Sequence, residues 1–219
     1  MVEGYVCSFQ KSTNRLDIVR CSVATATRNA DATRARLLAA AADEFATHGV
    51  AGARVDRIAA AAEANKQLIY AYFANKDGLF DAVLAKSCGA LAEAVPFDAL
   101  DMPGYVGRLF DYAVEHPQLY RLVSWAALER PHAVAAFERE SYRAKLDAIS
   151  SAQTAGRLDA SLAPADLLAL LMAVAAAWFS ASEAIRTFDS KAPMSARRLA
   201  QFRHAAVEAA SRIIGRPET

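Results

Sequence analysis

The sequence lacks most of the features that point to an enzyme or to a metal protein. It has no glycine-rich phosphate loop and no GxSxG or HExxH motif, and its four histidines are dispersed without catalytic spacing. Its three cysteines, Cys7, Cys21 and Cys88, show neither CxxC nor Cys/His ligand spacing, which indicates a reducing compartment and no zinc site. We therefore expect no enzymatic activity, no metal and no cofactor.

Long apolar runs and a secretion signal are missing as well. The longest apolar run, residues 167–181, is shorter than the roughly 18–20 residues that cross a bilayer. The N-terminus has no apolar core followed by a small-residue cleavage site. These features predict a cytoplasmic protein with no membrane partner. The formal net charge of +1 neither favours nor excludes a nucleic-acid partner, because it does not show where the charges lie.

Glycine and proline are scarce, with nine and seven residues among 219. Alanine and leucine dominate a composition that is 54% hydrophobic, so helices are favoured over short strands and the predicted class is all-α. Residues 1–30 show no sustained period, which predicts a flexible N-terminal extension. The patterned remainder divides into a small N-terminal unit at residues 31–80 and a larger helical bundle at residues 81–215.

Capping residues and glycines set the expected helix ends in the N-terminal unit. The predicted helices are Arg34–His48, capped by Asp31 or Thr33 and stopped by Gly49; Val55–Ala62; Lys66–Phe73, capped by Asn65; and one from Lys76, capped by Asn75 and halted by Pro96. Further helices are expected near residues 104–115, 117–129, 132–154, 164–187 and 196–214.

Two short helices around a three-residue break, with a third helix behind them, form the pattern of a helix-turn-helix. On a helical wheel, Ile69 and Phe73 lie on the inner face, and Gln67 and Ala71 point away from them. The polar side chains that flank this outer face suit DNA, because phosphate contacts set the register and base-edge contacts carry the sequence information. The alternative is that the tyrosines are core aromatics and the lysines are solvated surface charges.

Residues 34–84 resemble the tetracycline repressor family of bacterial transcription regulators. The resemblance rests on Phe-x-x-x-Gly at residues 45–49, Ile-Ala at 58–59, and Ile-Tyr-x-Tyr-Phe-x-x-Lys-x-x-Leu at 69–79. It implies a homodimeric repressor with helix-turn-helix heads, released from a palindromic operator in double-stranded DNA by a small-molecule inducer, at the bacterial nucleoid. The positions that match the family's DNA contacts are Arg54, Lys66, Gln67, Tyr70, Ala71, Tyr72 and Lys76.

Two positions depart from the family pattern. Arg54 stands where the family usually has a threonine that touches phosphate, a contact that an arginine can also make. Glu63 stands where the turn usually carries glycine, and a left-handed conformation there costs a non-glycine residue roughly 1 kcal/mol. Either the turn differs slightly, or Glu63 points toward solvent or toward a basic neighbour such as Arg57.

The C-terminal bundle carries less specific signals. The helix expected at residues 164–187 is apolar nearly all round in its first half, and the last helix has small residues that permit close approach, so both are predicted to form a two-fold dimer interface. A small apolar or aromatic inducer is expected to bind near the bulky residues of this bundle, although core packing is the competing explanation for them. The candidate ligand-binding residues are Trp125, Met172, Trp178 and Phe179, with His116 or Glu129 supplying polarity.

A helical interaction or ligand-binding protein without sequence-specific DNA binding is the alternative function. Under that alternative Lys66 and Tyr70 would be ordinary surface residues. The sequence does not identify the inducer, the operator or the regulated genes.

Overall fold

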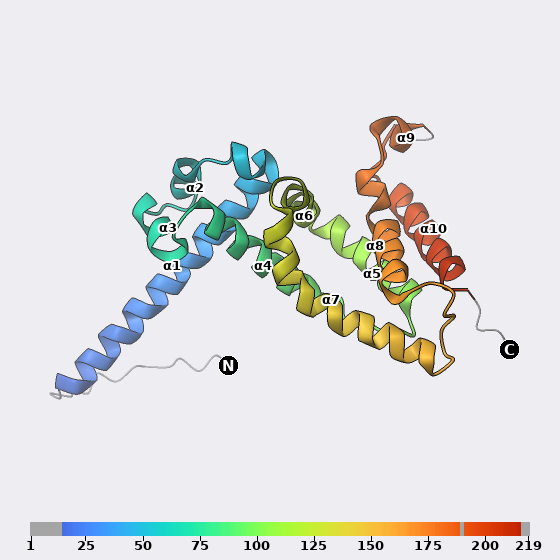
Figure 1. Cartoon of the computed structure of the whole chain (residues 1–219). Coiled ribbons are helices and arrows are strands. Elements are labelled where there is room, and N and C mark those ends of the chain that lie inside the picture. The colour runs from blue at the N-terminus through green and yellow to red at the C-terminus, as the bar shows by residue number, and fades with distance from the viewer. Residues whose placement is uncertain (1–14, 189–190, 216–219) are drawn as a thin grey trace, which may run out of the picture.

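The chain is all-helical in the computed structural model, which describes residues 15–188 and 191–215, with side chains described from residue 29 onward except at 132–138. The helices are α1 (Arg15–Gly52), α2 (Val55–Ala61), α3 (Lys66–Phe73), α4 (Lys76–Ala94), α5 (Met102–Glu115), α6 (Pro117–Glu129), α7 (Pro131–Thr154), α8 (Pro164–Ser180), α9 (Glu183–Thr187) and α10 (Ala196–Ile214). Figure 1 shows a head of α1, α2, α3 and the start of α4 at one end, and a body of the remaining helices at the other.

The head is built around aromatic and aliphatic side chains that α1, α2, α3 and α4 contribute in turn. Phe45 and Phe80 are fully buried and meet edge to face, with ring centroids 5.1 Å apart. Ile58 and Ile69 pack in the same cluster. Each comes from the apolar stripe of its own helix, so the 3.6-residue spacing of the sequence translates directly into this core.

Helix α6 joins the head to the body. Its Leu122 and Ala126 belong to the head cluster, and α6 packs along α1. In the body, α5, α8 and α10 pack against one another around a second cluster that includes Met102, Val106 and Leu171. The division expected at residue 80 therefore lies within α4, and α6 also contributes to the core of the head.

Several predicted helix ends agree with the structure and two do not. The Asn65 and Asn75 side chains cap α3 and α4, as predicted, by accepting the backbone N–H of Gln67 and Gly78, each at 2.8 Å. Helix α1 begins at Arg15 and not at Arg34. The predicted cap at Asp31 or Thr33 is wrong, because both residues lie inside α1 and the Thr33 hydroxyl donates to the Asn29 carbonyl at 2.8 Å.

The second boundary error concerns residues 164–187, predicted as one helix. The structure ends α8 at Ser180 and starts the short α9 at Glu183, because Ala181 and Ser182 are extended and Ser182 caps α9 through the N–H of Ile185. Flexibility of residues 1–30 stays a prediction, and residues 1–14 lie outside the described residues. Across the described ranges, no helix is both long enough and apolar enough to cross a membrane.

Candidate functional site

The α2–α3 unit has the geometry of a helix-turn-helix. The turn closes through backbone hydrogen bonds from Glu63 to Ala60 at 3.1 Å and from Ala64 to Ala59 at 3.0 Å. Glu63 has φ of 48°, the left-handed conformation expected for a position that favours glycine. Its side chain is exposed, and the expected alternative partner Arg57 is bound to Glu44 instead. Glu63 therefore points toward solvent.

The outer face of α3 is free for a partner. Ile69 and Phe73 are buried against the head, as predicted, while Lys66, Gln67, Tyr70 and Ala71 are exposed. Tyr70 keeps 48% of its surface accessible, so its ring is not a core aromatic. Helix α3 thus packs on the head by its buried face and exposes its opposite face. A helix placed in this way can enter the major groove of DNA.

Lys66 has a partner that the sequence alone does not predict. Its Nζ lies 2.6 Å from Oδ1 of Asp56 on α2, with both side chains largely exposed. The hydrogen bond to Asp56 raises the pKa of Lys66, so the ammonium stays charged. An exposed ion pair of this kind is weak and leaves Lys66 available to a phosphate.

The predicted backbone-contact residues lie around the edge of the same face. The Lys76 Nζ donates to the carbonyls of Ala51 and Ala53, both at 3.3 Å, and so ties the start of α4 to the turn before α2. Arg54 is exposed at the N-cap of α2, and Tyr72 is half-buried on α3. An ammonium group has three donors, so Lys76 can hold this turn and still meet a phosphate.

Glu44 on α1 organises the turn before α2. Its Oε1 accepts the backbone N–H of Arg54 and the Nε–H of Arg57, each at 2.8 Å, and only 10% of the side chain is exposed. Burial alone would raise the pKa of Glu44, but the hydrogen bonds from Arg57 and Arg54 outweigh it and hold the pKa below its usual value. The carboxylate thus fixes where α2 begins relative to α1.

Two of the predicted ligand residues lie instead at the joint between head and body. Glu129, at the end of α6, accepts the backbone N–H of Val50 at 3.2 Å and of Ala51 at 2.8 Å. A Cβ atom at Gly49 would lie 2.6 Å from the Glu129 carboxylate and 3.1 Å from the Trp125 ring. The structure therefore places Trp125 and Glu129 against the last turn of α1, where they hold α6 to α1.

Arg130 makes a second contact across this joint, which the sequence alone does not predict. Its guanidinium lies 3.3 Å from Asp77 and 3.2 Å from Asp81, which are one turn apart on α4. Two carboxylates at this spacing on one helix face are a sequence signal for a cation, but the sequence does not show which cation is close. The contacts of Glu44 and Asp56 had no comparable signal in the sequence that would have predicted them.

The body contains a small apolar cavity of about 170 Å³ between α4, α5, α6 and α8. Met172 lines it, as predicted, together with Leu91, Leu109 and Val123. Trp178 and Phe179 do not line it; they pack with Phe110, Tyr120 and Phe202, with ring centroids 5.0 to 5.5 Å apart. Trp178 is buried in this aromatic cluster and Phe179 is half-buried in it, and a ligand role for either residue stays a prediction.

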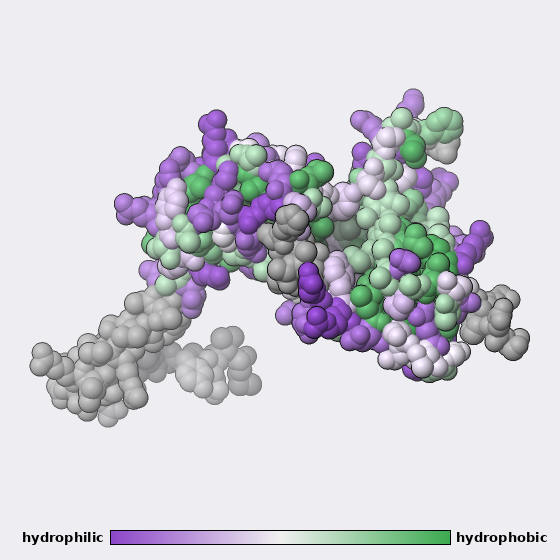
Figure 2. Space-filling view, in the orientation of Figure 1, coloured by the Kyte–Doolittle hydropathy of each residue, from purple (hydrophilic) through white to green (hydrophobic). Residues whose placement is uncertain are grey.

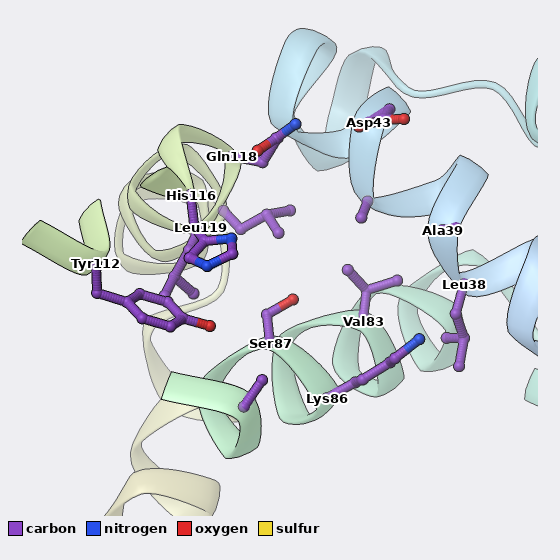
Figure 3. A pocket seen from close by; sticks show the side chains of 13 residues that line it. Leu38, Ala39, Asp43, Val83, Lys86, Ser87, Tyr112, His116, Gln118 and Leu119 are labelled. Atoms are coloured by element: carbon purple, nitrogen blue, oxygen red, sulfur yellow. The ribbon is translucent and has the colours of Figure 1, made fainter. Parts of the chain in front are cut away.

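A larger cavity of about 370 Å³ lies between α1, α4 and the turn that joins α5 to α6 (Figure 3). His116 lines this groove, so it contacts a different cavity from the one that Met172 contacts. Tyr112 and Leu119 line both spaces and form the wall between them. The six predicted ligand residues are thus divided among one joint, one aromatic cluster and two cavities.

Comparisons with known proteins agree with this architecture. Residues 37–83 match the family described as "Bacterial regulatory proteins, tetR family", and residues 101–212 match "Tetracyclin repressor-like, C-terminal domain". The HTH-type transcriptional repressor SCO4008 of Streptomyces coelicolor is 47% identical over 155 residues, which cover 68% of this chain and 80% of that protein. The HTH-type transcriptional repressor NicS of Pseudomonas putida is 31% identical over 104 residues, 44% of this chain and 49% of that one.

The crystal structure of SCO4942 from Streptomyces coelicolor, named as a transcriptional regulator, superposes with a TM-score of 0.71 at 39% sequence identity, covering 84% of this chain and 99% of that one. The chain belongs to the tetracycline repressor family. It is a DNA-binding transcriptional regulator with a helix-turn-helix head, and its family is one of regulators and not of enzymes. Members of the tetracycline repressor family bind DNA and function as dimers.

Proposed function

We propose that this protein is a homodimeric repressor that holds a palindromic operator through α3 and is released by a small apolar or aromatic inducer. The observation that supports it most is the exposed face of α3, with Gln67, Tyr70 and Ala71 open to solvent over the buried Ile69 and Phe73. The names of SCO4008 and NicS as repressors favour repression over activation. A repressor of this kind acts at the nucleoid, in the cytoplasm.

Each DNA-facing residue has a proposed role. Gln67 and Ala71 meet base edges in the major groove, where an amide can bond bidentately to adenine and a small apolar side chain can contact the thymine methyl group. Lys66, Tyr70 and Tyr72 flank them and reach phosphates. Arg54 and Lys76 hold phosphates on either side of α3, from the starts of α2 and α4. Such phosphate contacts fix the register of the head on the duplex.

The proposed dimer interface is formed by α8 and α10. Figure 2 shows hydrophobic surface gathered over α8, and Leu170 on this helix is 45% exposed. Exposed apolar patches on a folded protein mark interaction sites. The small residues Ala205 and Ala209, one turn apart on one face of α10, allow a second helix to approach closely. A two-fold dimer places two α3 helices in half-sites about one helical turn apart, or a multiple of it, and so selects a palindrome.

The proposed inducer site is the apolar cavity of the body. Its 170 Å³ is comparable to the roughly 150 Å³ cavity that accepts benzene in an engineered protein. Helix α4 connects this cavity, at Leu91, to the head, at Lys76. The dimer has one form whose head spacing matches the operator and another whose spacing does not. An inducer that binds the second form more tightly removes the dimer from DNA, and the effect is limited by the difference between its affinities for the two forms.

Selection of genomic fragments by the purified full chain tests the proposal. At about 150 mM salt, where non-specific binding is weak, the native protein is expected to enrich one palindrome. A Gln67→Ala, Tyr70→Ala double variant should lose that enrichment, and Arg157→Ala, at an exposed position in the body, should keep it. Enrichment that survives the double variant would contradict the assignment of α3 to DNA.

A further inference from the structure

The groove of about 370 Å³ between α1, α4 and the α5–α6 turn has the composition of a binding site. Its floor consists of buried aliphatic side chains, among them Leu38, Val83, Leu119 and Leu122. Cavities of this size, mostly apolar with a few polar groups, are typical of small-molecule sites. The groove is larger than the body cavity and is separated from it by Tyr112 and Leu119.

Most of the polar side chains that line the groove can donate a hydrogen bond, and Asp43 is the exception. Figure 3 shows the Tyr112 hydroxyl, the Ser87 side chain and the His116 ring facing the space, with Lys86 along the α4 wall. Among the described residues, the side chains of Lys86, Ser87 and Tyr112 make no hydrogen bond or ion pair. Burial, and secondarily Cys88, raises the pKa of Tyr112, so its hydroxyl keeps its proton and can donate. These three side chains can therefore donate hydrogen bonds to the acceptor of a bound ligand.

We propose that this head–body groove binds a small amphipathic carboxylate, whose apolar part covers Val83 and Leu119 and whose carboxylate meets Lys86, Ser87 and Tyr112. Lys86 supplies the positive charge, and the two hydroxyls supply neutral donors. The one carboxylate of the groove, Asp43, comes from the α1 wall, so it discriminates against a ligand with a second anionic group near α1. This site is distinct from the inducer cavity of the body.

The position of the groove allows such a ligand to affect DNA binding. One wall is α1 of the head, at Leu38, Ala39, Ala42 and Asp43, and the opposite walls belong to α4 and to the start of α6. A molecule bound between them contacts the head and the body together, so its affinity depends on the angle between the two. This regulatory consequence rests on the proposed repressor function, whereas binding of the carboxylate does not.

Calorimetric titration of the full chain with three matched probes tests the binding site. The probes are 2-naphthoate, its neutral amide 2-naphthamide, and the cationic 2-naphthylmethylammonium. We expect 2-naphthoate to bind most tightly. Lys86→Met should weaken 2-naphthoate by about three- to fivefold, as an exposed charge pair does, and leave the amide unchanged. Asp43→Asn should shift 2-naphthoate affinity in the opposite direction.

Two filling variants locate the probe. Ala90→Trp and Ala39→Trp project from exposed positions into the groove and should each weaken 2-naphthoate about tenfold or more by steric misfit. Met172→Phe fills the body cavity alone and should leave the affinity within about twofold. Loss of binding in Met172→Phe with retention in both tryptophan variants, equal affinity for the three probes, or absence of 2-naphthoate binding would each overturn the proposal. Because no DNA is present, these outcomes are independent of the fragment selection.

Discussion

The head and the body hold their helices together in different ways. In the head, side chains tie the turns directly: Glu44 holds the start of α2, Lys76 holds the carbonyls of Ala51 and Ala53, and Glu129 holds the N–H groups of Val50 and Ala51. In the body, α5, α8 and α10 meet mainly through apolar and aromatic packing, and one ion pair, between Arg203 and Asp111 at 2.8 Å, joins α10 to α5. Directional contacts therefore dominate at the turns that hold the proposed DNA-reading face, whereas packing dominates between the helices of the body.

The largest expected effect comes from emptying the core of the head. Phe45 is fully buried against Phe80, so Phe45→Ala should reduce the free energy of unfolding by about 3–5 kcal/mol. Met172→Ala in the body should cost only about 1–2 kcal/mol, since Met172 is half-buried beside a cavity that already exists. Urea unfolding measures both, and equal losses would remove this contrast between head and body.

The joint at Gly49 gives the next largest effect. Gly49 has φ of 69° and ψ of 179°, a conformation open essentially to glycine alone, and a Cβ there would collide with Glu129. Gly49→Ala should therefore cost about 2–3 kcal/mol. Gly52→Ala is the matched control, because its Cβ would meet only His48 at an ordinary 3.5 Å. Thermal unfolding compares them, and a Gly49→Ala protein as stable as Gly52→Ala would contradict the role of this joint.

The Glu44 carboxylate should make the stability of the head depend on pH. Its folded pKa lies below the usual 4.5, so its contribution is full above that value and is lost as the pH falls through the folded pKa. Glu44→Gln should cost about 2 kcal/mol at pH 7, as expected for hydrogen bonds to a charged group. The two proteins should converge in stability as the pH falls below 4.5 and through the folded pKa of Glu44. A constant difference across this range, in unfolding curves measured at several pH values, would contradict the assignment.

The smallest effect concerns the ion pair between Lys66 and Asp56. Asp56→Asn frees Lys66 for phosphate and should raise the affinity for non-specific DNA by about two- to fivefold at low salt, with stability changed by less than about 0.5 kcal/mol. Glu63→Gln removes the same charge from the head without touching Lys66, so it should raise affinity less. Anisotropy titrations of a labelled duplex measure both, and equal gains would show that total charge alone acts.

The sequence predicted the head more completely than the body for a physical reason. Asn65 and Asn75 act on backbone groups two or three residues away, so their roles can be recognised from local sequence. Glu129 and Val50 are brought together by packing of α6 on α1, and no local pattern shows that contact. The same limit applies to Trp178 and Phe179, because their bulk alone does not show whether they line a pocket or fill a core.

The helix ends show the same dependence on local signals. The bounds of α3 agree with the prediction because Asn65 begins the helix and the buried Ile69 and Phe73 fix its inner face. The break at Ala181 was missed because the apolar run gives no stop signal, and Ser182 alone starts α9. Agreement is therefore greatest where capping and periodicity act together.

The most direct test of α3 as the DNA-reading element compares base preferences on the selected operator. Binding is measured to a full set of single-base operator variants by native protein, Gln67→Ala and Tyr72→Phe. We expect Gln67→Ala to lose about 1–3 kcal/mol of binding free energy at the preferred base and to relax the preference at one position in each half-site, while Tyr72→Phe weakens binding to all sequences evenly. An unchanged base preference at every position in Gln67→Ala would contradict this expectation.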